Sequence, residues 1–246
     1  MRVGEIIDPA AEIASLLSWW QEAGVDVLVD EESRNWLAPV ERAPVSRTAP
    51  IAPAAPAAKP AAAALPTDLA AFQAWLATSD DIAVPTAARI APAGNIASGL
   101  MLLADQPEAE DAETGLLMSG SIGKLFDNMM AAIGRDRASI YLAAMAPGRT
   151  AGGYVDPASA AFFGRLAHHH VAIAKPRLLL LLGEAPSRTM LGLGFVEARG
   201  RVHTIDLPGG AVRAVATFHP RTLIQHPAQK ARAWADLQLL MKTLAA

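Results

Sequence analysis

The chain has 246 residues, of which 52% are hydrophobic, so it is long enough to bury the core of one large domain. Its formal net charge of −3 argues against bulk binding of nucleic acid through charge alone. Cysteine is absent, which excludes disulfides, thiolate nucleophiles and cysteine-ligated clusters. The sequence shows neither a membrane-length apolar run nor a signal-peptide pattern at its start, so we expect a cytoplasmic protein without a membrane partner.

Two segments precede the predicted main domain. Residues 1–42 form a tryptophan-rich segment, and the apolar side chains between residues 6 and 29 recur near helical spacing. An amphipathic helix of this kind packs on its own domain or on a partner, so we expect a possible protein partner here. Residues 43–66 alternate proline with alanine, which disfavours helix and sheet and predicts a flexible linker.

The main domain, predicted over residues 67–246, alternates apolar strands with helices. Strands are predicted over residues 99–104, 139–145, 178–183, 202–207 and 212–218. The continuous apolar runs among them, such as residues 99–104, are typical of buried strands. Predicted helices begin after residues 67–68 and cover residues 121–133, 157–174, 185–191 and 228–244. This alternation predicts an α/β fold whose mostly parallel sheet carries helices on both faces and a ligand crevice at the strand ends.

Polar groups follow several of the predicted strands. Asp105 and Gln106 come after the first strand, and His219 comes after the last, where Pro220 predicts a stiff loop. A pocket that holds Asp105 and His219 has the groups for acid–base or water-activating chemistry. From the local sequence, the alternative is that His219 is a structural, hydrogen-bonded histidine.

Two further polar runs are predicted to be solvated. His168, His169 and His170 lie on a predicted helix, where successive side chains point about 100° apart and cannot share one metal ion. The acidic run over residues 108–113 is interpreted as a solvated loop, with a divalent-cation site as the alternative. Basic residues outnumber acidic ones over residues 184–246, which fits either a phosphate-facing surface or a solvated helix face.

Several short motifs occur in an order known from one family. Residues 104–108, Ala-Asp-Gln-Pro-Glu, stand where that family has Gly-Glu-Ala-Pro-Gly. Residues 115–123 keep the three glycines of its Gly-x-Pro-Phe-Val-Gly-x-Ala-Gly motif. Residues 217–220, Thr-Phe-His-Pro, with Leu223 match its Thr-Tyr-His-Pro-Ser-x-Leu-Leu segment. Over residues 69–244 the chain therefore resembles the uracil-DNA glycosylase superfamily, especially the branch that normally carries an iron–sulfur cluster.

The resemblance implies a three-layer αβα sandwich with a four-stranded, mostly parallel sheet. It implies an enzyme that flips a base out of DNA and hydrolyses the N-glycosidic bond of uracil or another deaminated base. In that role His219 stabilises charge on the base carbonyl and Asp105 orients water. It assigns substrate binding to Gln106, Pro107, Met118 and Ala144, and DNA binding to Arg221 and to the apolar wedge of Leu223 and Ile224.

The motifs depart from the family at residues that read the base. Asp105 replaces a glutamate, and Glu108 replaces a glycine that lets the backbone approach the ligand. Met118 replaces a phenylalanine that stacks on the base, and Ala144 replaces an asparagine that reads the uracil edge. Because a buried amide supplies much of the discrimination between bases, the base preferred by this chain stays open.

The cluster motif is also lost. Gly148 and Gly164 fall where two cluster cysteines would be, so we expect no iron–sulfur group and no other cofactor. Two alternatives to an active glycosylase stay open at this point. One is a catalytically weak or inactive module that binds DNA or a protein, and the other is an unrelated doubly wound hydrolase.

Overall fold

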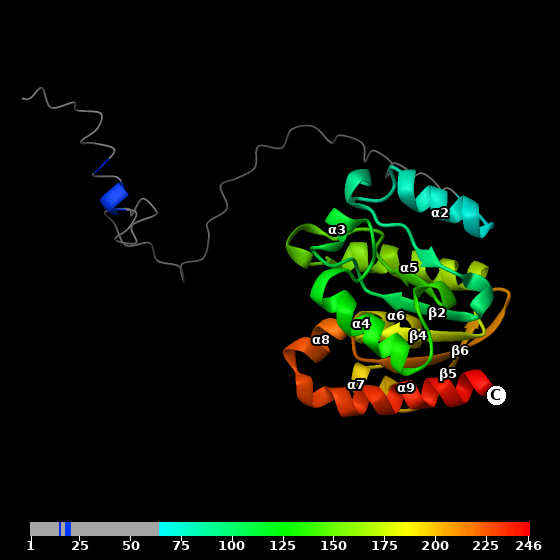
Figure 1. The fold of residues 1–246 in the computed structure, drawn as a ribbon. Helices are drawn as coiled ribbons and strands as arrows, with labels where there is room; N and C mark the ends of the chain where they lie inside the picture. Colours follow the sequence, from blue (N-terminus) through cyan, green and yellow to red (C-terminus); the bar gives the residue numbers. More distant parts are fainter. Residues whose placement is uncertain (1–14, 16–17, 21–63) are drawn as a thin grey trace, which may run out of the picture. The chain divides into compact units, whose positions relative to one another are not determined.

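The computed structural model describes residue 15, residues 18–20 and residues 64–246 (Figure 1). The chain divides into two units, Met1–Lys59 and Pro60–Ala246. Within the described part, no helix combines the length and the apolar character needed to cross a membrane.

Most of the predicted N-terminal organisation lies outside the described residues. Residues 15 and 18–20, within the segment predicted over residues 1–42, are helical, and Trp19 and Trp20 are exposed. Of the predicted linker, residues 43–66, only the last three residues are described.

A six-stranded mixed sheet forms the middle of the domain, so the predicted count of four strands is wrong. The strands are β1 (Ala93–Gly94), β2 (Leu100–Ala104), β3 (Tyr141–Ala144), β4 (Leu178–Leu182), β5 (Val202–Leu207) and β6 (Gly210–Thr217). Their order is β1-β3-β2-β4-β6-β5. The central four are parallel, as expected, whereas β1 and β5 add antiparallel edges. A tight turn joins β5 to β6, so the two strands pair as an antiparallel hairpin at one edge of the sheet. At the other edge, β1 has only two residues and is too short to show an apolar pattern in the sequence.

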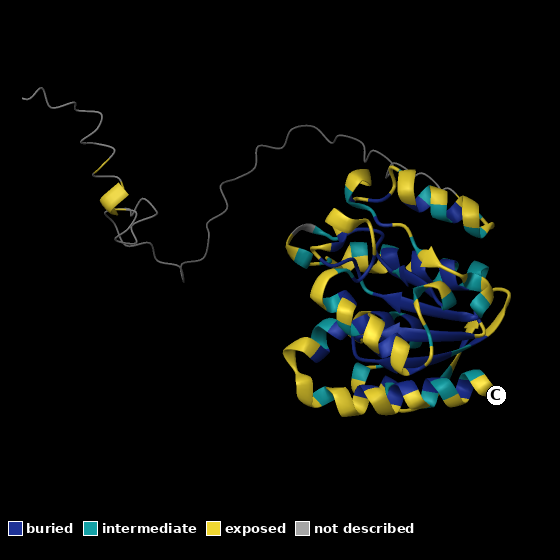
Figure 2. Cartoon of the chain, viewed as in Figure 1, coloured by how far each residue is buried: buried dark blue, intermediate teal, exposed yellow. Residues whose placement is uncertain are grey.

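Helices cover the sheet on both faces. The described α-helices are α2 (Leu69–Thr78), α3 (Asp111–Thr114), α4 (Gly120–Ala132), α5 (Pro157–Ala174), α6 (Glu184–Leu191), α7 (Phe195–Ala198), α8 (Pro220–Gln225) and α9 (Lys230–Ala245). Alternate residues of β2 point to opposite faces: Met101 and Leu103 join a cluster with α2, α5 and α6, while Leu100 and Leu102 join one with α4, α8 and α9. Figures 1 and 2 show the buried sheet between these helices.

Local sequence signals position several helices as predicted. α2 begins after Asp68, whose side chain accepts a hydrogen bond from the Ala71 N–H at 3.0 Å. α5 covers the predicted residues and begins with a proline after a capping aspartate. The predicted stiff loop after His219 is wrong, because α8 begins there. Pro220 occupies the first helical position, where its fixed backbone and missing N–H favour a helix start.

The region of the lost cluster cysteines does not fit an iron–sulfur group. A Cβ atom on Gly148 would lie 2.6 Å from both Val84 Cγ1 and the Ala88 carbonyl oxygen, so no side chain fits there. Hydrogen bonds hold this region instead. The Arg89 guanidinium donates to three backbone carbonyls within residues 76–84, at 2.9 to 3.1 Å.

A buried ion pair joins Asp236 on α9 to Arg199, the residue after α7, whose backbone forms a bridge to Ala216 of β6. Arg199 Nη2 lies 2.7 Å from Asp236 Oδ2, and the two side chains are 14% and 2% exposed. Burial raises the pKa of Asp236, and Arg199 opposes that effect. The Arg199 guanidinium also lies 4.0 Å from the ring centroid of Phe218, which directly precedes His219. The pair therefore fixes the strand end that carries His219.

Removing Asp236 should destabilise the domain. In Asp236→Ala the buried Arg199 charge loses its partner, and we expect the free energy of unfolding to fall by about 3 kcal/mol. Urea unfolding followed by circular dichroism measures the change. Glu197→Ala, which removes an exposed acid from α7, is the matched control and should shift the midpoint little. Equal midpoints for both variants would contradict the role of the pair.

The three consecutive histidines of α5 contact three different groups. The His168 Nε2 atom lies 3.1 Å from the Thr189 carbonyl oxygen, and the His169 Nε2 atom lies 2.7 Å from the Pro66 carbonyl oxygen. The His170 Nε2 atom lies 2.8 Å from the Tyr141 hydroxyl oxygen. His170 is only 2% exposed, so the prediction of a solvated helix face is wrong for this residue. Its partner lies on β3, far away in the sequence, where helical periodicity gives no signal.

The His170 contact belongs to a buried network between α2, β3 and α5. The Gln73 amide donates to the Tyr141 hydroxyl oxygen at 2.7 Å, which leaves the hydroxyl proton for His170 Nε2 at 2.8 Å. Burial lowers the pKa of His170 to about 4 and raises the pKa of Tyr141 to about 12. His170 is therefore neutral and accepts a hydrogen bond.

Acidification should weaken the fold through His170. Its pKa is about 4 in the folded state against 6.5 ordinarily, so the unfolded state binds more protons between these values and stability falls as pH falls. We expect this histidine to account for a loss of about 3 kcal/mol between neutral pH and pH about 4. His219, whose pKa is also lowered, adds a loss of the same sign.

Urea unfolding at a series of pH values measures the His170 contribution. His170→Gln keeps a polar side chain without a titrating ring, so its stability should fall less on acidification than that of the wild type. His226→Gln removes an exposed histidine and should keep the full loss. The same pH dependence in His170→Gln and in the wild type would show that His170 does not cause it.

Candidate active site

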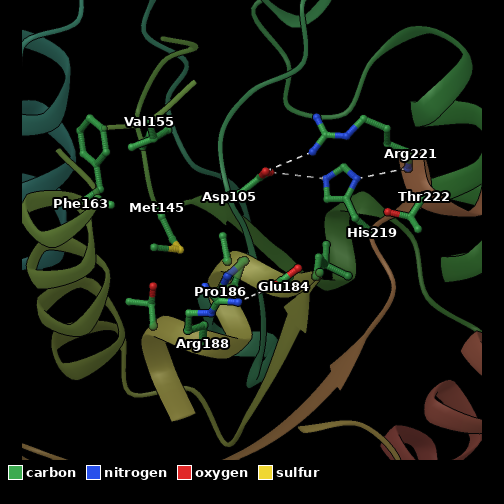
Figure 3. Close-up of a pocket in the computed structure, with 16 residues that line it drawn as sticks. Asp105, Met145, Val155, Phe163, Glu184, Pro186, Arg188, His219, Arg221 and Thr222 are labelled. Carbon is green, nitrogen blue, oxygen red and sulfur yellow. Dashed lines mark hydrogen bonds and ion pairs between the residues drawn. The ribbon is translucent and has the colours of Figure 1, made fainter. Parts of the chain in front are cut away.

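A cavity of about 470 Å³ lies at the carboxyl ends of the central strands. Asp105 after β2, Met145 after β3, Gly183 after β4 and His219 after β6 all line it (Figure 3). Parallel strands end at the same edge of a sheet, so residues far apart in the sequence meet there. Asp105 and His219, which the sequence predicts at the ends of two strands, therefore converge on one region.

His219 is buried and presents one ring nitrogen as a donor. Its Nδ1 atom accepts a hydrogen bond from the Arg221 backbone N–H at 3.2 Å, so the ring proton of the neutral form lies on Nε2. Burial lowers the pKa of His219 to about 4, Asp105 opposes this effect and Arg221 adds to it. His219 is therefore neutral at pH about 7 and carries an Nε2–H donor.

A glycine allows the His219 ring to sit this close to β4. Gly183 has a φ of +95°, and a Cβ atom there would lie 3.2 Å from the Cβ of His219. Both the backbone conformation and the close contact disfavour any other residue. The position of His219 thus depends on the glycine that follows β4.

Two carboxylates and an arginine surround His219. Its Nε2 atom lies 3.9 Å from Asp105 Oδ1 and 3.8 Å from Glu108 Oε1. Arg221 Nη2 lies 3.1 Å from Asp105 Oδ2, and Arg221 Nη1 lies 3.0 Å from Glu108 Oε1. Arg149 Nη1 lies 3.9 Å from Glu108 Oε2. Burial raises the pKa of Glu108, whereas the two arginines lower it.

Asp111 holds the loop that carries Glu108. Its carboxylate is fully buried and accepts hydrogen bonds from the backbone N–H groups of Glu108, Met118 and Ser119 at 2.6 to 2.9 Å. The prediction of a solvated loop over residues 108–113 is therefore wrong for Glu108 and Asp111. Within the described chain, no group of three His, Cys, Asp or Glu side chains is arranged to hold a metal ion.

The predicted substrate residues Gln106 and Pro107 bind the neighbouring loop instead of lining the cavity. The Gln106 amide donates to the Gly153 carbonyl at 2.8 Å and accepts from the Thr150 hydroxyl at 3.1 Å. The Pro107 carbonyl accepts a hydrogen bond from Arg149 Nη1 at 3.1 Å. Both residues are buried and fix the loop after β3 against the loop after β2.

The other two predicted substrate residues lie on the far face of the sheet. Met118 is 2% exposed and packs in the apolar cluster below α4, with a φ of +54°. Ala144 is half-buried against the same cluster. Neither lines the 470 Å³ cavity, which opens beside α5 and α6. The structure thus brings Asp105 and His219 together at the cavity, whereas the side chains of Met118 and Ala144 belong to the apolar cluster.

The predicted DNA-binding residues also differ in their surroundings. Leu223 is 1% exposed and lies in the core, whereas Ile224 is 44% exposed. Arg221 lines the cavity and pairs with Asp105 and Glu108. Of the two apolar residues, Ile224 alone is therefore exposed, and Leu223 is part of the core.

Several cavity walls come from residues that sequence reasoning missed. They are Val155, Phe163, Pro186, Arg188 and Thr189 (Figure 3). Helical spacing on α5 gives a signal that Phe163 faces inward. The other four give none, because only the three-dimensional arrangement of the loops and α6 brings them to Asp105.

A family model now supports the motif resemblance. The model described as the uracil DNA glycosylase superfamily matches residues 91–238, which include the central strands, Asp105 and His219. None of the curated proteins matches the chain. The matched residues make up more than half of the 246-residue sequence. The chain therefore belongs to the uracil DNA glycosylase superfamily.

Proposed function

We propose that this protein is a DNA glycosylase that hydrolyses the N-glycosidic bond of uracil or another deaminated base, as a step of base excision repair. Family membership supports the reaction class, since the superfamily generally hydrolyses N-glycosyl bonds. The observation that carries the proposal is the buried, neutral His219, whose Nε2 atom lies 3.9 Å from Asp105 Oδ1 beside the cavity.

His219 supplies a hydrogen bond to the departing base. When the glycosidic bond breaks, its electron pair moves onto the base and negative charge develops on a carbonyl oxygen. A neutral Nε2–H donor, held in place before the reaction, stabilises that charge more in the transition state than in the substrate. The lowered pKa of His219 suits this role, because the ring stays neutral and still carries its Nε2–H donor.

Asp105 supplies the negative group beside the sugar. Its side chain is 26% exposed, lines the cavity, and leaves Oδ1 without a hydrogen bond among the described residues. A carboxylate in this position orients a water molecule toward the anomeric carbon and offsets the positive charge that develops on the sugar. Water oxygen bonds to that carbon as the base leaves, and the water proton passes to solvent or to the base.

DNA binding follows from the need to expose the base. Enzymes of this class extrude the target nucleotide from the stack, and an exposed apolar side chain fills the gap. Ile224 is exposed beside the site, and Arg149, Arg188 and Arg221 lie around it as candidate phosphate contacts. A protein partner for the segment with the exposed Trp19 and a cytoplasmic location stay predictions.

The second candidate is a module of the same fold that binds DNA or a protein without catalysis. The observation that favours it is the ion pair between Arg221 and Asp105 at 3.1 Å, which occupies one oxygen of the proposed water-orienting group. The reading as an unrelated doubly wound hydrolase is wrong, because the chain belongs to the glycosylase superfamily.

Base release from defined oligonucleotides separates the two candidates. The substrates contain uracil, hypoxanthine or xanthine in single- or double-stranded DNA, and alkali cleaves the abasic sites formed. We expect release from at least one substrate, with a rate that falls about 100- to 1,000-fold in His219→Ala, because one charge-stabilising donor is lost. His226→Ala removes an exposed histidine near the end of α8 and should keep the wild-type rate.

The negative outcomes are equally specific. No abasic sites from any substrate at high enzyme concentration would refute the glycosylase. Binding of the same oligonucleotides without cleavage, lost at high salt, would support the module. An unchanged rate in His219→Ala would remove His219 from the mechanism.

A further inference from the structure

Three buried polar atoms around the His219 ring have no hydrogen-bond partner among the described residues. One is Asp105 Oδ1, and the other two face each other. They are His219 Nε2 and Glu108 Oε1, which lie 3.8 Å apart on side chains that are 4% and 8% exposed. Arg221 Nη1 also lies 3.0 Å from Glu108 Oε1, but its hydrogen bond goes to Oε2 at 3.1 Å. Buried polar atoms are nearly always hydrogen-bonded, so this pair points to a ligand that completes it.

The pair consists of one donor and one acceptor. His219 Nε2 carries the ring proton because Nδ1 accepts the Arg221 N–H, and an ionised Glu108 only accepts. In a base whose carbonyl accepts from His219, as the proposed function requires, the neighbouring ring nitrogen is the group that Glu108, 3.8 Å from His219 Nε2, would contact. In uracil, hypoxanthine and xanthine this nitrogen carries a hydrogen. In cytosine it carries a lone pair, which a carboxylate repels, and adenine has no carbonyl to offer.

The loop of Glu108 is fixed in advance. The Glu108 backbone N–H donates to the fully buried Asp111 at 2.8 Å. At the position where the family has an asparagine that reads the base edge, this chain has Ala144. Its side chain has no polar group and packs in the cluster on the other face of the sheet. Glu108 is thus a buried acceptor within 4 Å of His219, and in this structure Arg221 pairs with it.

We propose that Glu108 selects the base, its carboxylate accepting the ring N–H next to the carbonyl that His219 holds. This inference rests on the glycosylase function and names its substrate class, bases that present a lactam edge. The same carboxylate rejects cytosine through its unprotonated ring nitrogen. Selectivity that the family obtains from an amide comes here from a charged acceptor on the loop after β2.

Arg221 must leave Glu108 before the base arrives. Arg221 lines the cavity and Glu108 does not, and Arg221 Nη1 lies 3.0 Å from Glu108 Oε1. The Arg221 side chain is 30% exposed and can exchange its carboxylate partners for a DNA phosphate. Arg149 Nη1 lies 3.9 Å from Glu108 Oε2, and its positive charge favours the ionised form of Glu108. Burial and the nearby Asp105 have the opposite effect and raise the pKa of Glu108.

The first test compares base release by the full-length wild type, Glu108→Gln and Glu113→Gln. The substrates are two pairs of oligonucleotides that differ at one position. The first pair contains uracil or cytosine there, and the second contains hypoxanthine or adenine. Glu108→Gln should release the lactam bases about 10- to 100-fold more slowly, since a hydrogen bond to a charged group is weakened. Its preference over cytosine should shrink, because an amide turns either a donor or an acceptor to the ring nitrogen. Glu113 is exposed on α3, and Glu113→Gln should match the wild type.

A second test needs no turnover. Oligonucleotides with 2′-fluoro nucleotides resist glycosidic cleavage, and fluorescence anisotropy gives their Kd values. The wild type and Glu113→Gln should bind the uracil oligonucleotide about 10-fold more tightly than its cytosine counterpart, and Glu108→Gln should lose this preference. The urea midpoint of each variant checks that its fold is intact.

The outcomes separate this inference from the proposed function. Release of lactam bases with unchanged rate and selectivity in Glu108→Gln would overturn the role of Glu108 and leave the glycosylase standing. Preferential binding that depends on Glu108, without any release, would support base selection and refute the glycosylase. Preference of the wild type for cytosine, or no preference at all, would overturn the inference whatever the rate of release.

Discussion

The hydrogen bond from the Arg221 backbone N–H to His219 Nδ1 determines what the site can do. It occupies one ring nitrogen, so the proton lies on the other, and burial keeps the ring neutral. The bond exists because β6 ends at Thr217 and Pro220 starts α8, which makes His219 the residue that caps the helix. A helix start therefore sets the tautomer of the proposed catalytic histidine, and the glycine after β4 leaves room for its ring.

Charge balance is the second constraint. Asp105 and Glu108 bring two acids close to a buried ring, and Arg221 and Arg149 offset them. Buried carboxylates are tolerated only when they are paired or hydrogen-bonded. Because Arg221 pairs with both acids, its transfer to a phosphate would couple DNA binding to exposure of Asp105 and Glu108. The same arginine thus links the predicted DNA surface to the proposed chemistry.

Features encoded locally were predictable from the sequence. The apolar runs of β2 and β4 and the capped helices α2 and α5 lie where their patterns indicate, and the order of motifs identified the superfamily that the family model confirms. The edge strand β1 was missed because two residues give no periodicity. The start of α8 has no clear signal, because a proline after a strand fits both a break in the chain and the first position of a helix.

The environment of the site was less predictable, because it depends on contacts between distant segments. Glu108 and Asp111 lie in an acidic run that looks solvated, yet both are buried by the loop around Met118 and by α8. His170 is buried by Tyr141, which lies 29 residues earlier in the sequence. In each case the fold brings a polar side chain next to a partner from a distant segment. Hydrophobic periodicity describes only neighbouring residues of one segment, so it gives no signal of such a contact.

The protonation state of His219 is the central claim and is directly measurable. Nitrogen NMR of ¹⁵N-histidine-labelled protein, with His219→Gln for assignment, distinguishes the two neutral tautomers from the cation. At pH about 5.5, where an ordinary histidine with a pKa of about 6.5 is mostly protonated, we predict a neutral His219 with its proton on Nε2. A cationic ring at this pH, or a proton on Nδ1, would contradict the account.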